Sequence, residues 1–169
     1  MAVKRQRAES RRSLKVAQER ALRLVPATGR LEELVDNVAL ASGRPLRLLP
    51  FELGRDEPTG LWISTDAADY VVYPSSASAA QRTAIVCHEL AHMLLQHQPV
   101  GEAAQLAALA AAAAPSIDPV IARRMLARHG YEQEAESDAE MLATRLVARL
   151  ASSAEKNCLA HDTVSTRLR

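Results

Sequence analysis

His88, Glu89 and His92 form an H-E-x-x-H motif, with Leu90 and Ala91 between the glutamate and the second histidine. On a helix, side chains four positions apart lie on the same face, one turn above the other. Two imidazoles at this spacing can bind one zinc ion, and the glutamate between them can reach a water molecule on that ion. The motif therefore predicts a metal-dependent hydrolase with His88 and His92 as zinc ligands and Glu89 as the general base.

The motif lies in a segment that we expect to form one helix, as a metal site of this kind requires. Ser75-Ser76-Ala77-Ser78 offers hydroxyl groups that can cap a helix, and neither proline nor glycine occurs from Ala79 to Gln98. The apolar faces on which the helix would pack are formed by Ile85, Val86, Leu90, Met93 and Leu94. The alternative interpretation is a helix whose histidines make only core or surface hydrogen bonds.

A catalytic zinc site usually has three protein ligands and one open position, so a third ligand must come from elsewhere in the chain. His97 lies five residues after His92, and we expect it to face away from the metal as a surface or capping residue. The natural alternative is a carboxylate from a later helix. Several acids crowd the start of the last predicted helix: Glu132, Glu134, Glu136, Asp138 and Glu140.

Helical periodicity distinguishes among these acids. The core-facing stripe of the last helix is predicted to consist of Ala139, Leu142, Ala143, Leu146 and Val147. Glu136 and Glu140 extend this stripe toward its N-terminal end, whereas Glu134 is explained by the preference of acids for the positive end of the helix dipole. An acid on a core-facing stripe needs a partner. A zinc ion would supply one for Glu136, and Glu140 could accept a hydrogen bond from the outer nitrogen of a ligand histidine.

The composition indicates one domain with mainly helical packing. The chain has 169 residues, of which 48% are hydrophobic and only 3% aromatic, and this balance favours helix-on-helix packing over a large aromatic-rich sheet. The net charge of +1 gives the molecule no general preference for polyanions. Two cysteines, Cys87 and Cys158, cannot make a disulfide scaffold. Because adjacent helix residues point about 100° apart, we expect Cys87 to be a small buried hydrophobe rather than a thiolate ligand.

Short segments rich in β-forming residues indicate a small sheet. Strands are predicted over residues 45–49, 61–64 and 70–73. Helices other than the motif helix are predicted over residues 14–25, 31–40, 103–114 and 120–128, and from Tyr131 or Glu132 to Ala151. The predicted fold is therefore α+β: a mainly helical single domain with a small antiparallel sheet of about three strands, packed by the H-E-x-x-H helix.

The two ends of the chain are expected to lie outside the packed domain. Residues 1–13 are predicted to be a basic flexible leader, 14–151 the domain itself, and 152–169 a polar, disordered tail. No apolar segment follows the basic N-terminal residues as in a secretory signal, and the longest apolar run is too short to span a bilayer. We expect a cytoplasmic protein without membrane contact. Direct nucleic-acid binding is not expected, because no aromatic residues are interleaved with the basic ones.

Three segments together carry a resemblance to a known family. They are Thr83–Leu95 around the motif, Tyr70-Val71-Val72-Tyr73-Pro74 before it, and Glu136–Ala143 in the last helix. On these segments, over roughly residues 31–150, the chain resembles the ImmA/IrrE family of zinc metallopeptidases. The last segment is similar to that family's E-x-E-A-[N/D]-x-F-A pattern, from which Asp138, Glu140 and Leu142 depart.

The resemblance implies a zinc-dependent endopeptidase in which Glu136 is the third metal ligand. An alignment that begins at Glu134 would make that residue the ligand instead. The resemblance also implies a protein substrate, a helix-turn-helix repressor or a similar regulator. The alternative function is a toxin-like or regulatory partner of a DNA-binding antitoxin that acts without proteolysis. The intact Glu89 favours the peptidase, because pure binding has no need of a general base.

Overall fold

Helices make up most of the structure. The structure is a computed structural model, and it describes residues 2–52, 60–64, 67–97 and 133–167. The helices are α1 (Ala2–Leu22), α2 (Leu31–Ser42), α3 (Ala79–Leu94) and α6 (Gln133–Arg167). The strands are β1 (Leu46–Phe51), β2 (Leu61–Ser64) and β3 (Asp69–Pro74). The predicted α+β class, mainly helical with three strands, is confirmed. The helices predicted over 103–114 and 120–128 lie outside the described residues.

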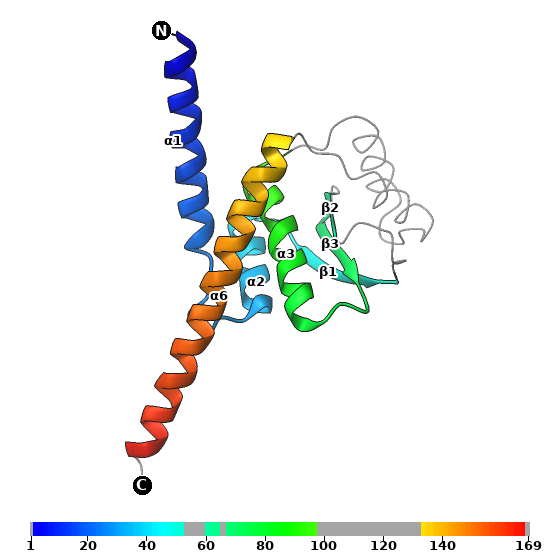
Figure 1. Ribbon diagram of the computed structural model, residues 1–169. Helices are drawn as coiled ribbons and strands as arrows, with labels where there is room; N and C mark the ends of the chain where they lie inside the picture. Colours follow the sequence, from blue (N-terminus) through cyan, green and yellow to red (C-terminus); the bar gives the residue numbers. More distant parts are fainter. Residues whose placement is uncertain (1, 53–59, 65–66, 98–132, 168–169) are drawn as a thin grey trace.

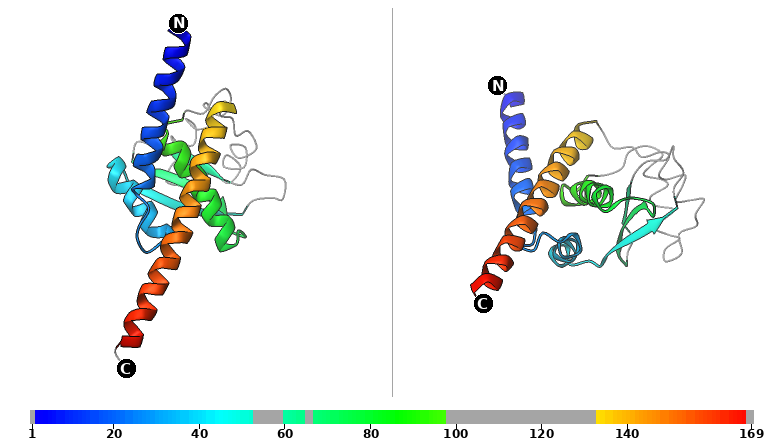
Figure 2. Two further views of the ribbon diagram at one scale, coloured as in Figure 1. Left: turned by 60° about the vertical axis from the view of Figure 1, so that its left-hand side comes forward. Right: turned by 60° about the horizontal axis from the view of Figure 1, so that its bottom comes forward.

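The described elements form three layers, with α2 and α3 between the sheet and α6 (Figure 1). The right-hand view of Figure 2 shows these layers in succession, with α1 on the same side as α6. Helix α3 contacts β2 and β3 on one side and α6 on another. The H-E-x-x-H motif, which α3 carries, is therefore placed between the sheet and the last helix.

The sheet is mixed, so the prediction of an antiparallel sheet is wrong for one of its two strand pairs. The strand order is β1-β3-β2. Strand β2 runs antiparallel to β3, with Leu61 opposite Val72, whereas β1 runs parallel to β3, with Leu46 opposite Asp69. Because β1 pairs with the far edge of β3 and not with β2, its direction is set by a non-local contact. The alternation of side chains along a strand is the same in both arrangements and does not distinguish them.

The hydrophobic core is formed mainly by the facing sides of α2, α3 and α6. The predicted core-facing stripe of α6 is confirmed, since Ala139, Leu142, Ala143 and Leu146 are buried and Val147 packs against them. From α3, the core receives Val86, Cys87, Leu90 and Ala91, all fully buried. These contacts fix the rotation of α3 about its axis, and with it the direction in which the motif histidines point.

A capping box begins α3, in agreement with the serine-rich segment before it. The Ser78 hydroxyl accepts a hydrogen bond from the Gln81 backbone N–H at 3.3 Å, and the Gln81 side-chain oxygen accepts one from the Ser78 N–H at 2.9 Å. Two backbone donors that would otherwise lack partners are satisfied reciprocally. The start of the helix is therefore set ten residues before His88.

The first and last helices are longer than predicted. Helix α1 begins at Ala2 and α6 continues to Arg167, where the sequence analysis expected a flexible leader over 1–13 and a disordered tail over 152–169. Neither helix contains glycine or proline, so nothing interrupts propagation from the packed turns.

Gly29 lies against the backbone of α6. It has a φ of +71° and packs so closely on Leu150 and Ala154 that a Cβ at this position would collide with them. None of the described helices is both long and apolar enough to cross a bilayer.

Candidate metal centre

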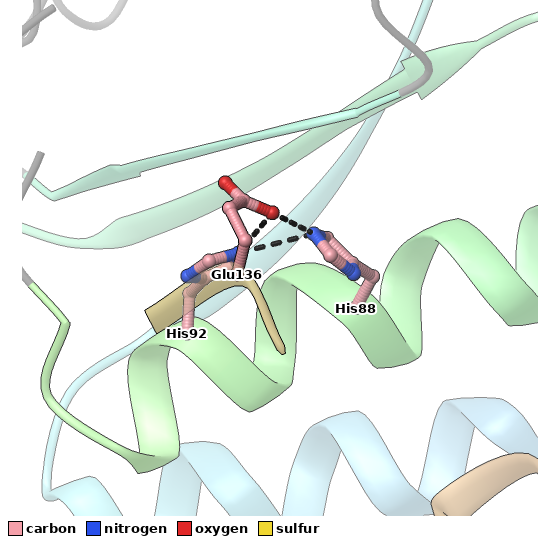
Figure 3. A group of neighbouring side chains, drawn as sticks. All are labelled: His88, His92 and Glu136. Carbon is pink, nitrogen blue, oxygen red and sulfur yellow. Dashed lines mark hydrogen bonds and ion pairs between the residues drawn. The ribbon is translucent and has the colours of Figure 1, made fainter. Parts of the chain in front are cut away.

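The three side chains predicted as metal ligands converge at one point. His88 and His92 extend from one face of α3, and Glu136 reaches them from the first turns of α6 (Figure 3). The two Nε2 atoms lie 3.0 Å apart. Glu136 Oε2 is 3.5 Å from His88 Nε2 and 3.7 Å from His92 Nε2. This His-His-Glu group could hold a metal ion, whereas Glu134, the alternative ligand, is exposed and does not belong to it.

The spacing of the three ligand atoms fits a tetrahedral ion of the size of zinc. Zinc binds imidazole nitrogen and carboxylate oxygen at about 2.0–2.1 Å, which places two ligand atoms of a tetrahedron about 3.3–3.4 Å apart. The observed separations of 3.0, 3.5 and 3.7 Å lie on both sides of this value. The donor set of two imidazoles and one carboxylate is also one that zinc uses in catalytic sites. The residues present therefore fit the predicted metal.

Glu89 lies beside these three ligands and is enclosed by the sheet. Its side chain is 2% exposed. Burial raises the pKa of Glu89 to about 8, the backbone N–H of Trp62 opposes this shift by donating a hydrogen bond, and the negative charge of Glu136 adds to it. Among the described residues, Glu89 Oε2 has no hydrogen-bond partner. A buried polar atom without a partner is uncommon, and it is expected where a water molecule or an ion belongs.

Strand β2 holds the backbone that contacts Glu89. Asp69, which is 2% exposed, accepts hydrogen bonds from Trp62 Nε1 at 3.2 Å and from Arg44 Nε at 3.1 Å. The buried carboxylate is thus paired with a charged donor, as its burial requires. These bonds join β2 to β3 and to the segment between α2 and β1, so the Trp62 N–H is presented to Glu89 from a fixed strand.

Gly60 leaves the space that Glu89 occupies, a role that the sequence analysis missed. A Cβ at position 60 would lie 2.8 Å from Glu89 Oε1 and 2.5 Å from Ile85 Cγ2. Both distances are shorter than ordinary contact. The only signal in the sequence was a glycine immediately before a predicted strand, which is equally typical of a turn.

Gly60→Ala is expected to displace Glu89 without changing the metal ligands. Because a displacement of about 1 Å in a catalytic group can cost 100-fold in rate, the peptide hydrolysis that the H-E-x-x-H motif predicts should fall by about 10- to 100-fold. Zinc affinity should stay near the wild-type value, since the atoms nearest to a Cβ at position 60 belong to Ile85 and Glu89 and not to the predicted ligands. The measurement is kcat/KM together with zinc affinity. Gly43→Ala is the control for loss of stability alone: a Cβ at Gly43 meets nothing within 4 Å, whereas the φ of +67° disfavours alanine, so this variant should be less stable and keep wild-type hydrolysis. Unchanged hydrolysis in Gly60→Ala would contradict the assigned position of Glu89.

His97 packs against His92 and does not face away from it, so the expectation of a surface position is wrong, whereas the expectation of a capping residue agrees with the hydrogen bond from its backbone N–H to the His92 carbonyl at the end of α3. Its Nδ1 lies 3.1 Å from His92 Nδ1, and burial lowers the pKa of His97. The prediction assumed a helix that continues through His97. In the structure the helix stops at Leu94, and Gln96 adopts a φ of 57°, which turns the chain back toward α3.

Glu140 lies near His88, as predicted, but it is a weaker partner than expected. Its Oε2 is 3.6 Å from His88 Nδ1, and its side chain is 75% exposed. This distance is longer than a hydrogen bond. Water competes for both groups at such an exposed position. Glu140 is therefore close enough to His88 for an electrostatic contact, but the predicted hydrogen bond between them is not formed.

Cys87 is part of the hydrophobic core and turns away from the metal centre. It is fully buried among apolar side chains of α3 and α6. Burial raises the pKa of its thiol to about 12, so the thiolate form that binds metals is strongly disfavoured. The interpretation of Cys87 as a small buried hydrophobe agrees with this position.

A groove of about 550 Å³ lies beside the metal centre, between α3 and α6. His88 and Glu140 lie at its polar part. Its apolar part is lined by Ile85, Ala143 and Val147. The groove is large enough for a peptide side chain, and its lining favours an apolar one.

Comparisons with protein-family models, curated proteins and solved structures found no match to this chain. The chemistry of the site therefore rests on its own geometry.

Proposed function

We propose that the protein is a zinc-dependent endopeptidase. The observation that carries the proposal is the position of Glu89, which is buried next to the His-His-Glu group with one carboxylate oxygen unpartnered among the described residues. A site that only stored a metal or stabilised the fold would not need a fourth side chain here, a carboxylate that does not bind the metal. A general base must lie within reach of the proton that it accepts, and the proposal places that proton on a water molecule at the unpartnered oxygen of Glu89.

In the proposed mechanism, three residues bind the metal and a fourth transfers protons. His88, His92 and Glu136 would hold zinc through Nε2, Nε2 and Oε2, the atoms that converge. When bound, zinc would act as a Lewis acid that activates water and polarises the peptide carbonyl. Glu89 would accept a proton from the attacking water at its free carboxylate oxygen and then donate that proton to the leaving amine. The hydrogen bond from the Trp62 N–H would keep the Glu89 carboxylate in position for both proton transfers.

The substrate that we propose is a helix-turn-helix transcriptional regulator, or a similar regulatory protein, in the cytoplasm. This part of the proposal is supported by the resemblance of the motif segments to the ImmA/IrrE family. The groove beside His88 adds a preference that the chain itself suggests, because its apolar lining would receive an apolar substrate side chain next to the cleaved bond.

Metal removal and reconstitution test the proposed activity. We expect the zinc-loaded protein to cleave a helix-turn-helix regulator at defined bonds, the chelator-treated protein to lose this cleavage, and added zinc to restore it. The measurement is the intact mass of the regulator and its fragments over time. Formation of a stable complex without any fragment would instead support a binding partner, and it would refute the peptidase.

A further inference from the structure

We propose that His97 positions the metal ligand His92: it accepts a hydrogen bond from His92 Nδ1 and so keeps His92 Nε2 directed at the metal. This role rests on the zinc centre of the proposed function, but not on peptidase activity. His97 touches no ligand atom itself, and therefore it is a positioning residue and not a catalytic one.

The rings of His92 and His97 meet at His92 Nδ1, the nitrogen that points away from the metal position. His92 Nε2 faces His88 Nε2 at 3.0 Å and Glu136 Oε2 at 3.7 Å. On the opposite side of the same ring, His92 Nδ1 faces His97 Nδ1 at 3.1 Å. The rings of His92 and His97 meet edge to face, with an interplanar angle of 70°. Because the His92 side chain is fully buried, its Nδ1 depends on a protein partner.

The direction of this hydrogen bond follows from the position of the metal. A neutral imidazole that binds a metal through Nε2 carries its hydrogen on Nδ1. His92 Nδ1 is therefore the donor and His97 Nδ1 the acceptor, which places the hydrogen of His97 on its Nε2. Partners of this kind fix the tautomer and the ring orientation of metal-binding histidines.

The backbone holds His97 at this position through a Schellman motif at the end of α3. The N–H of His97 donates to the carbonyl of His92 at 3.0 Å, and the N–H of Gln96 donates to the carbonyl of Met93 at 3.1 Å. Gln96 supplies the left-handed conformation that this motif requires. His92 and His97 are thus linked twice, once through the backbone and once through their rings, so the helix end and the ligand orientation are set by the same turn.

The two ligand histidines are supported unequally. The outer nitrogen of His88 has Glu140 at 3.6 Å, with a side chain that is 75% exposed. The outer nitrogen of His92 has a nearer partner held by a turn of backbone. We therefore expect the loss of His97 to weaken metal binding more than the loss of Glu140.

Zinc affinity of three variants tests this role, measured by competition with a chromophoric chelator. His97→Leu removes the acceptor, whereas His97→Asn keeps an acceptor oxygen close to the position of Nδ1. Because loss of such a partner typically costs 10- to 100-fold in metal affinity, we expect a decrease of about that size for His97→Leu and of less than about threefold for His97→Asn. Glu140→Gln should show a smaller decrease than His97→Leu. Thermal unfolding of the metal-free variants separates loss of the fold from loss of the ligand geometry.

The tautomer of His92 provides a second measurement that does not depend on any variant. In the zinc-loaded wild-type protein, the ¹⁵N shifts of His92 should show a metal on Nε2 and a hydrogen on Nδ1. Metal on Nδ1, or equal zinc affinity of His97→Leu and wild type, would overturn the proposal. Wild-type protein that binds no zinc would overturn both the metal centre and the role of His97. If the wild-type protein binds zinc and the variants show the expected changes in zinc affinity, but no peptide is cleaved, only the proposed peptidase activity is refuted.

Discussion

Glu89→Gln is expected to reduce peptide hydrolysis by about 100- to 10,000-fold, the contribution typical of a general base, while zinc remains bound. Glutamine has nearly the same shape as glutamate but cannot accept a proton. Oε2 makes no hydrogen bond to the described residues, so the amide breaks no bond there, and the other oxygen can still accept from the Trp62 N–H.

The measurements are kcat/KM on the cleaved regulator and the zinc content of the same preparation. Glu134→Gln is the matched control, because Glu134 is exposed near the start of α6 and outside the His-His-Glu group. Wild-type cleavage by Glu89→Gln would refute the assignment of the general base. Loss of zinc from Glu89→Gln would show that Glu89 is a ligand, and the proposed division between ligands and base would fail.

Glu136→Ala is expected to lose zinc binding and, with it, all hydrolysis. Removal of an outer partner of a ligand typically costs 10- to 100-fold in affinity, so removal of one of three ligands should exceed about 100-fold. The fold should be preserved, because the Glu136 side chain is 38% exposed at the start of α6 and is not part of the core. Metal analysis of protein purified without added metal and competition with a chelator give the measurement.

Glu134→Ala is the control for the competing alignment. It removes an acid of the same type from the same turn of α6, and we expect it to keep wild-type zinc affinity. The opposite result, in which Glu134→Ala loses zinc and Glu136→Ala retains it, would assign the third ligand to Glu134. Retention of zinc by both variants would refute a carboxylate ligand from this helix.

Much of the site could be predicted from local pattern. The separation of His88 and His92 places them on one helix face whatever the rest of the fold, because the period of an α-helix is fixed by its hydrogen bonds. The apolar stripe of α6 favoured Glu136 over Glu134 as the third ligand, although Glu140, which extends the same stripe, is 75% exposed. Ser78 marked the start of α3 for an equally local reason, the need of the first backbone N–H groups for an acceptor.

Other features depended on contacts between segments far apart in the chain, and local pattern could not supply them. The parallel pairing of β1 with β3 is one, since a strand shows which residues alternate but not which strand lies beside it. The space that Gly60 leaves for Glu89 is another, because it exists only after β2 has packed on α3. The helical continuation of α6 past Ala151 was missed because a polar composition was weighed above the absence of helix-breaking residues.

The sequence by itself determined that two imidazoles and a glutamate share a helix and that an acid on a second helix faces the same core. Helical periodicity depends only on the order of residues along the chain, so it can be recognised from the sequence without knowledge of the fold. Only the tertiary structure decided that Glu136 meets both histidines, that Glu89 is buried under β2, and that the turn after α3 brings His97 to the back of His92. These positions follow from how faces pack against one another and from where a helix ends, and both are settled by contacts made in three dimensions.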